Sequence, residues 1–224
     1  TVGTEERYFE KVIDIIQEYP FVYGAVGIHP HNSKDLKEGL IPKINRVLAH
    51  KKIVAYGEIG LDFFKNYSPK EIQIDAFIKQ LALAGQAKLP VIIHSRNAEE
   101  ETVKILRETD RSDAGGVIHC YSYSLDTARK MLDLGFYISI PGTITYSNTQ
   151  RLAEVVRYIP MGSLLAETDA PFLTPHPFRG KRNKPHYVKY TIERIAQIKN
   201  KDVIEVSSCI LENFKRLFLS NLKE

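Results

Sequence analysis

The sequence has only two cysteines among its 224 residues, Cys120 and Cys209, and it has no long apolar run. Two isolated cysteines form neither a zinc-finger pattern nor a disulfide framework, so we expect free thiols in a reducing compartment, the cytoplasm. No stretch approaches the length of about 18 apolar residues that a membrane-spanning helix needs, so we expect no membrane partner. Linkers and low-complexity tracts are also missing, which favours a single domain over residues 1–224.

The composition excludes general disorder, because 43% of the residues are hydrophobic and 26% are charged. The net charge of +4 is mild, but the basic residues gather in one segment. Five of them fall between residues 179 and 189 without an acid among them: Arg179, Lys181, Arg182, Lys184 and Lys189. This clustering favours a polyanionic partner.

Short apolar runs alternate with longer amphipathic segments along the chain. The expected strands, rich in Val, Ile and Leu, are residues 22–28, 53–57, 90–94, 116–119, 136–140 and 164–167, with a strand tail at Val2-Gly3. The expected helices are residues 5–19, 70–88, 98–109, 125–134, 149–158, 187–198 and a last one from about 203. We expect Thr4 to cap the first helix, Ser68-Pro69-Lys70-Glu71 to form a capping box, and Asp202 to cap the last helix. Strict alternation predicts a parallel sheet, either open or closed as a barrel.

Side chains of the kind that bind metals follow the carboxyl ends of these strands, where barrel active sites are assembled. Glu58, His94, His119 and Asp169 each end a different strand, so they are expected to converge. Imidazole and carboxylate ligands together suit Zn, Mn, Fe or Mg, and a carboxylate can bridge two ions. Taken singly, each residue is better explained by a structural role; together they favour one or two divalent ions.

Further strand-end residues are candidates for contacts with substrate. His29 and His31 flank Pro30 and are expected to bind a phosphate or transfer a proton, with a purely structural loop as the alternative. Arg96 follows His94 by two residues and is a candidate phosphate ligand.

The segment 174–185, TPHPFRGKRNKP, is too rich in Pro, Gly and basic residues to be a helix or a strand. It follows the Asp169 strand, so we expect it to overhang the mouth of the site. Arg179, Lys181 and Arg182 are expected to bind phosphate, and Phe172 and Phe178 to stack on bases. A solvated loop without a ligand is the alternative.

These motifs together resemble the TatD family of metal-dependent deoxyribonucleases, within the amidohydrolase-like barrels. The resemblance lies in GIHPH (27–31), GEIGLDFF (57–64), LPVIIHSR (89–96), VIHCYS (117–122) and, most specifically, ETDAPFLTPHPFRGKRNKP (167–185). It implies a (β/α)8 TIM barrel of the metallo-dependent hydrolase type, with one to three divalent ions, that cleaves DNA, commonly as a 3′→5′ exonuclease acting on single strands or 3′ ends.

The resemblance also implies roles for residues of this sequence. It implies Glu58, His94, His119 and Asp169 as metal ligands, with Glu58 bridging, and places His31 and the 179–182 segment near the scissile phosphate. Our mechanistic hypothesis makes Asp169 the group that orients or deprotonates the attacking water, while Arg179 and Arg182 offset charge on the phosphoryl oxygens.

One departure from the family concerns the N-terminal end. Members begin with a strand that carries a His-x-His pair of metal ligands, and that strand is absent here. At about 250 residues for eight units, the first strand, its helix and most of a second strand amount to roughly 30–40 residues. We therefore expect a barrel that is incomplete at its N-terminus and, because open sheet edges are avoided, unstable, oligomeric or completed by another segment.

Three functions fit these observations. The first is a DNA-cleaving phosphodiesterase. The second is a related metallohydrolase that acts on aminoacyl-tRNA or on a small ester or amide. The third is a catalytically impaired nucleic-acid-binding protein, because the N-terminal histidine pair is absent. The basic segment argues against a small neutral substrate but does not separate DNA from tRNA.

Overall fold

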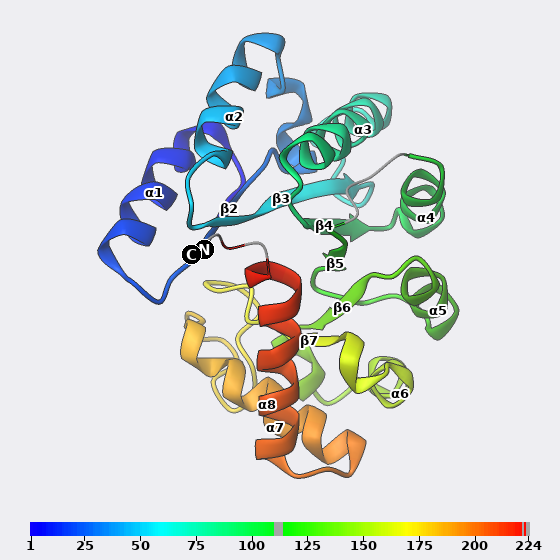
Figure 1. Ribbon diagram of the computed structural model, residues 1–224. Coiled ribbons are helices and arrows are strands. Elements are labelled where there is room, and N and C mark those ends of the chain that lie inside the picture. Colours follow the sequence, from blue (N-terminus) through cyan, green and yellow to red (C-terminus); the bar gives the residue numbers. More distant parts are fainter. Residues whose placement is uncertain (110–113, 221, 223–224) are drawn as a thin grey trace. The chain divides into compact units, whose positions relative to one another are not determined.

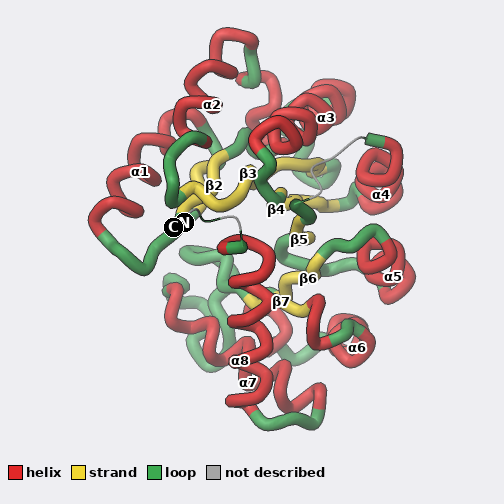
Figure 2. Tube along the Cα trace, viewed as in Figure 1, coloured by secondary structure: helices red, strands yellow, loops and turns green. Residues whose placement is uncertain are grey.

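The computed structural model describes residues 1–109, 114–220 and 222, and it has an α/β fold (Figures 1 and 2). The strands are β1 (Val2–Gly3), β2 (Gly24–Val26), β3 (Ile53–Asp62), β4 (Val91–Arg96), β5 (Gly116–Ile118), β6 (Tyr137–Ile140) and β7 (Leu164–Ala166). They form a seven-stranded parallel sheet. The α-helices are α1 (Phe9–Glu18), α2 (Ile41–Leu48), α3 (Lys70–Ala87), α4 (Glu99–Glu108), α5 (Leu125–Asp133), α6 (Gln150–Tyr158), α7 (Val188–Lys199) and α8 (Val203–Phe214).

Contacts within the chain divide it into two compact units. Unit 1 comprises Thr1–Val117 together with Leu217–Glu224, and unit 2 comprises Ile118–Arg216. Unit 1 therefore holds β1 to β4 with helices α1 to α4, and unit 2 holds β6 and β7 with helices α5 to α8. Among the described residues, no helix is both long and apolar enough to cross a membrane.

In unit 1 the strands pair in the order of the sequence, all parallel. Val2 aligns with Ala25, Gly24 with Ile53, and Tyr56 with Val91. Helices α1 to α4 lie along one side of these strands in Figure 1. The largest fully buried side chains of unit 1 include Phe9, Ile16, Ile44, Tyr56, Ile59, Phe77, Leu81 and Ile93. Burial of these side chains on folding is the main favourable contribution to the stability of unit 1.

In unit 2 the strands β6 and β7 pair in parallel, with Ile138 opposite Leu164 and Ile140 opposite Ala166. Apolar faces of α5 to α8 supply the rest of the core. Its side chains without solvent exposure include Met131, Ile138, Val155, Val156, Leu164, Ile195 and Val206. The polar ends of β5 and β7 therefore extend from an apolar core.

The strands and helices expected from the sequence are confirmed, apart from α2 and the length of β3. Residues 41–48 were not expected to be helical, although Pro42 is tolerated in the first turn and Ile44, Val47 and Leu48 are buried on one face. The strand expected at 53–57 continues to Asp62. Strand β1 confirms the strand tail at Val2-Gly3. The incomplete N-terminus and the single domain stay predictions.

Two of the three expected helix caps are wrong. Thr4 caps no helix, because the first helical turn begins at Glu6, after Glu5. The capping box at residues 68–71 does not form either: Pro69 is the N-cap residue of α3, and the Ser68 hydroxyl donates to the carbonyl oxygen of His31 instead, at 2.9 Å. Asp202 does cap α8 and accepts hydrogen bonds from the backbone of Ile204 and Glu205.

Candidate metal-binding sites

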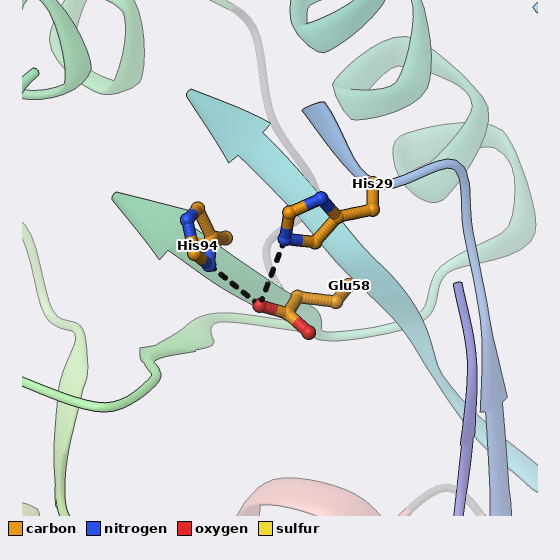
Figure 3. Close-up of side chains that lie close together, drawn as sticks. All are labelled: His29, Glu58 and His94. Atoms are coloured by element: carbon orange, nitrogen blue, oxygen red, sulfur yellow. Dashed lines mark hydrogen bonds and ion pairs between the residues drawn. The ribbon is translucent and has the colours of Figure 1, made fainter. Parts of the chain in front are cut away.

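One group of ligand-type side chains lies in unit 1, after the end of β2 and in the carboxyl-terminal halves of β3 and β4. It consists of His29, Glu58 and His94 (Figure 3). The Nδ1 atom of His94 is 2.7 Å from Oε1 of Glu58, and the Nε2 atom of His29 is 3.6 Å from the same oxygen. All three side chains are largely buried, with exposed fractions of 13% to 17%. One potential ligand atom from each residue lies within 4.8 Å of the others.

The backbone of β3 explains why Glu58 points toward His94. Gly57 aligns with Ile92 and Ile59 with Ile93, so Glu58 is an extra residue that bulges out of the ladder between β3 and β4. Such bulges change the direction of a side chain and are frequent beside functional sites. Gly60, opposite His94, has a φ of +136°, and a Cβ atom there would collide with the carbonyl oxygen of His94. Only glycine therefore permits this approach of the two strands.

Asp62 connects His94 to His31. Its Oδ2 atom is 2.9 Å from Nε2 of His31 and 3.2 Å from Nε2 of His94, and its side chain is 1% exposed. Burial alone would raise the pKa of Asp62, but hydrogen bonds from His94, from the backbone of Lys65 and from His31 outweigh it and hold this pKa below its usual range. Asp62 is therefore a buried carboxylate that fixes both rings.

The imidazole of His29 is neutral at physiological pH. Its burial lowers its pKa to about 3, and this effect exceeds the opposite influence of the Glu58 carboxylate. Neutral imidazole is the form that binds a metal ion. His29 is thus chemically suited to a ligand role, whereas the sequence predicted a phosphate contact for it.

Two glutamine side chains of α3 hold the strand ends that carry this group. Gln80 bonds both the backbone N–H and the carbonyl of Ile28, at 2.7 and 3.0 Å. Gln73 accepts from the backbone of Asp62 and donates to the carbonyls of Asp62 and Ser68. Both glutamines are buried, and neither was expected as a site residue. Through these hydrogen bonds, one helix, α3, holds both the residue before His29 and the end of β3 in place.

A second group of ligand-type side chains lies in unit 2, at the ends of β5 and β7. It consists of His119, Cys120 and Asp169, again with ligand atoms within 4.8 Å of one another. The Nε2 atom of His119 is 4.0 Å from Oδ1 of Asp169. Neither Cys120 nor Cys209 forms a disulfide, so the sulfur of Cys120 is a chemically competent ligand.

Glu167 orients His119 within the second group. Its Oε2 atom is 2.8 Å from Nδ1 of His119 and accepts the backbone N–H of Cys120 at 3.1 Å. Because a carboxylate only accepts hydrogen bonds, Nδ1 of His119 carries a proton, so in the neutral imidazole Nε2 is the lone-pair atom on the side of Asp169. This carboxylate–imidazole pair is the arrangement that supports histidine ligands of metals in proteins.

The basic segment 174–185 also lies in unit 2. Its buried Asn183 donates to the carbonyl oxygen of Thr168 at 2.7 Å, which ties the segment to the residue before Asp169. The Arg179 guanidinium lies 4.4 Å from the Tyr146 ring centre. Arg179, Lys181 and Arg182 are exposed, so their charged groups are accessible to a polyanion.

The two aromatic residues expected to stack on bases differ in how accessible their rings are. Phe172 is 67% exposed, but Phe178 is stacked on Tyr187, with ring centres 4.6 Å apart and nearly parallel planes. One face of Phe178 is therefore already covered by a side chain of the same unit.

The structure brings Glu58 and His94 together and places His119 beside Asp169, while each pair lies in a different unit. It adds His29 and Cys120 to the ligand-type groups and shows Asp62 and Glu167 as supporting carboxylates. Sequence reasoning missed these last two because each stands beside a stronger candidate in the same motif. The available signal was a second carboxylate in each motif: Asp62 at the end of GEIGLD and Glu167 at the start of ETD.

The donor sets fit a divalent metal. Each group combines imidazole nitrogen with a carboxylate oxygen in a largely buried position, and neutral imidazole with carboxylate suits borderline ions such as Zn²⁺ and Mn²⁺. The histidines have hydrogen-bonding carboxylates behind them, Asp62 for His94 and Glu167 for His119.

The chain is similar to known proteins over most of its length. The profile of the TatD-related DNase family matches residues 1–219. The chain belongs to this family. The TatD-family chain is 46% identical over 220 residues to the uncharacterized metal-dependent hydrolase YabD of Bacillus subtilis, covering 98% of this chain and 86% of that protein. It is 33% identical to the uncharacterized metal-dependent hydrolase TatD of Mycobacterium tuberculosis, covering 88% and 76%.

A solved structure supports the same assignment. The crystal structure of YJJV, a TatD homolog from Escherichia coli K12, superposes on this chain with a TM-score of 0.92 and 32% identity, covering 98% of this chain and 85% of that one. This TatD-family chain is therefore a member of a family of metal-dependent hydrolases, and it carries candidate metal-binding groups of its own.

Proposed function

We propose that this TatD-family chain is a divalent-metal-dependent phosphodiesterase that cleaves DNA, removing nucleotides from 3′ ends of single strands. The observation that carries the proposal is the pair of ligand-type groups at strand ends, each with imidazole and carboxylate, in a chain that also presents an exposed basic segment. The family description as a DNase supports this choice of substrate. The basic side chains of the 174–185 segment would attract a polyanionic substrate.

We assign His29, Glu58 and His94 to one metal ion, and His119, Cys120 and Asp169 to another; Mg, Mn and Zn are the candidates. A bound divalent ion would supply a Lewis acid for the phosphoryl oxygen and a water of lowered pKa. A cytoplasmic location fits the free thiols.

The residues of this chain then have distinct tasks. Asp169 accepts the proton of the attacking water and holds that water in line with the phosphorus. His31, fixed by Asp62 at 2.9 Å, is placed to hydrogen-bond a phosphate oxygen or protonate the leaving oxygen. Arg179, Lys181 and Arg182 bind the flanking phosphates, where guanidinium forms bidentate contacts.

The direct test is release of labelled nucleotide from a 3′-labelled single-stranded oligodeoxynucleotide. We expect release with Mn²⁺ or Mg²⁺ and none with EDTA. Asp169→Asn should reduce the rate by at least 100-fold while the bound metal per chain falls by less than half, because one carboxylate oxygen is replaced by an amide oxygen of similar shape. Unchanged nuclease activity in Asp169→Asn at unchanged metal content would show that this carboxylate has no chemical role.

A matched control and a competing substrate sharpen the test. Asp133→Asn alters a carboxylate at the end of α5 in the same unit, far along the chain from both strand ends, and should leave the rate unchanged. An assay of aminoacyl-tRNA deacylation, run in parallel, distinguishes the proposed nuclease from a hydrolase that acts on aminoacyl-tRNA. Deacylation together with intact DNA would replace our proposal with that alternative.

A further inference from the structure

Two aromatic side chains stand exposed in the loop that follows β3. Phe64 is 54% exposed and Tyr67 is 61% exposed, in a loop that runs from Asp62 to the start of α3 at Lys70. Single exposed hydrophobic side chains are ordinary, but exposed aromatic side chains grouped in one short loop are typical of interaction sites. The loop therefore has the composition of a binding surface.

Cations accompany these rings. The guanidinium carbon of Arg96 lies 4.0 Å from the Phe64 ring centre, within cation–π distance. The Nζ atom of Lys65 is 5.9 Å from the same ring, and Nζ of Lys70 is 4.7 Å from the ring of Phe63. Within residues 1–109, 114–220 and 222, none of these three cations forms an ion pair with a carboxylate.

Hydrogen bonds to Asp62 hold the loop beside the first metal-type group. Oδ1 of Asp62 accepts the backbone N–H groups of Phe64 and Lys65, at 3.0 and 2.8 Å. The Tyr67 ring contacts the His31 ring edge-to-face, with centres 4.8 Å apart. Oδ2 of the same Asp62 bonds His31 and His94. A single buried carboxylate thus positions both the histidines and the exposed rings.

We propose that Phe64, Tyr67 and Arg96, with Lys65, form a platform on which single-stranded nucleic acid binds, its bases stacked on the two rings and its phosphates on the two cations. This inference rests on the proposed function and names the part of unit 1 that holds the strand beside His31. Stacking on aromatic rings is open to every base, and basic groups between the rings follow the backbone. A fixed loop binds with less loss of conformational entropy than a mobile one. The platform recognises single strands, since bases in a duplex have no free face.

Binding of a fluorescein-labelled oligothymidylate with phosphorothioate linkages tests the platform, because these linkages resist cleavage while metal is present. We expect Phe64→Leu and Tyr67→Leu each to weaken binding by about 5- to 160-fold, the range found for loss of one stacked base. Phe64→Tyr and Tyr67→Phe keep the rings and should bind within about twofold of the unaltered chain. Phe21→Leu, which changes a 78% exposed ring elsewhere in unit 1, should have no effect.

The cations are tested by salt dependence. Arg96→Ala should lower the slope of log affinity against log salt by about 0.7, the value for one phosphate contact on a single strand. Lys51→Ala, at an exposed lysine in the turn before β3, is the matched control and should leave the slope unchanged. An oligonucleotide of abasic residues should bind the unaltered chain and Phe64→Leu equally.

The outcomes separate the platform from the proposed function. Leucine variants that bind like the unaltered chain, or an unaltered chain that does not bind the oligonucleotide, overturn the platform. Hydrolysis of bis(p-nitrophenyl) phosphate by the unaltered metal-loaded chain is measured separately, because this small diester has no base to stack. Absence of that hydrolysis would count against the proposed function, whereas loss of oligonucleotide binding in the leucine variants would still support the platform.

Discussion

The Glu167 carboxylate fixes which nitrogen of His119 is available to a metal. Glu167→Gln keeps the shape of the side chain but removes the charge that favours a protonated Nδ1 on His119. Loss of such a supporting carboxylate typically weakens metal binding by 10- to 100-fold, and we expect a decrease of about that size here. Titration of Mn²⁺ or Zn²⁺ by calorimetry measures it.

An exposed glutamate of the same unit provides the control. Glu154→Gln removes one carboxylate charge, as Glu167→Gln does, but on α6 and away from the strand ends. It should leave metal affinity unaltered. A Glu167→Gln chain whose affinity equals that of the Glu154→Gln chain would contradict the positioning role.

The Tyr56 hydroxyl is a buried polar group without a hydrogen-bond partner among the described residues. Burying such a hydroxyl costs about 1–3 kcal/mol, so Tyr56→Phe should raise the free energy of unfolding by about 1 kcal/mol. Urea unfolding at pH 7 measures this change. An unfolding free energy lowered by Tyr56→Phe would show that the hydroxyl has a partner.

The same hydroxyl makes stability depend on pH. Burial raises the pKa of Tyr56 above its ordinary value of 10 in the folded chain. The folded state therefore keeps a proton that the unfolded state loses, and stability falls as the pH rises above about 10. The stability advantage of Tyr56→Phe should grow between pH 9 and pH 11, and an advantage that is constant over this range would contradict the assignment.

At this scale the sequence predicted the residue types of the site better than their roles. Glu58, His94, His119 and Asp169 follow apolar runs, so their position was readable. The role of His29 was not, because its contact with Glu58 depends on a bulge in β3 that no periodicity reveals. The assignments of all these residues as metal ligands stay predictions.

At the scale of elements, the approach of β3 to β4 depends on Gly60. Gly60→Ala would place a methyl group against the carbonyl oxygen of His94 at a φ of +136°, so strand and ligand must shift. We expect a loss of about 2–4 kcal/mol of stability and a metal affinity at least 10-fold lower. Thermal unfolding and metal titration on the same sample measure both.

Gly39 offers a matched control for this substitution. A Cβ atom built on Gly39 meets nothing within 4 Å, so Gly39→Ala should be nearly neutral for stability and for metal binding. If Gly60→Ala behaved like Gly39→Ala, the close approach of the strands would not be what holds His94 in place.

Helices and strands were predictable where the apolar pattern is strong. They were not predictable where an element is short or where a contact between distant side chains sets its boundary. The apolar runs predicted every strand, since strands buried on both faces have little polar alternation. The helix at 41–48 is too short for a clear period. Ser68 was expected to cap α3, but the nearby carbonyl of His31 takes its hydroxyl, a tertiary contact that local sequence does not contain.

At the scale of the whole molecule, bound metal should stabilise the fold. An ion that binds only the folded chain adds about 2.7 kcal/mol at a concentration 100 times its Kd, which raises the Tm of a chain of this size by about 5–10 °C. Differential scanning fluorimetry with Mn²⁺ against EDTA measures the shift. Equal Tm values in the two conditions would contradict folded-state metal binding.

The measurement that tests the central claim most directly is the number of metal ions bound per chain, determined by elemental analysis after dialysis. We predict two ions for the unaltered chain and one each for His94→Ala and His119→Ala, because each substitution removes a ligand from a different group. Identical metal content in all three chains, or none in the unaltered chain, would contradict the account.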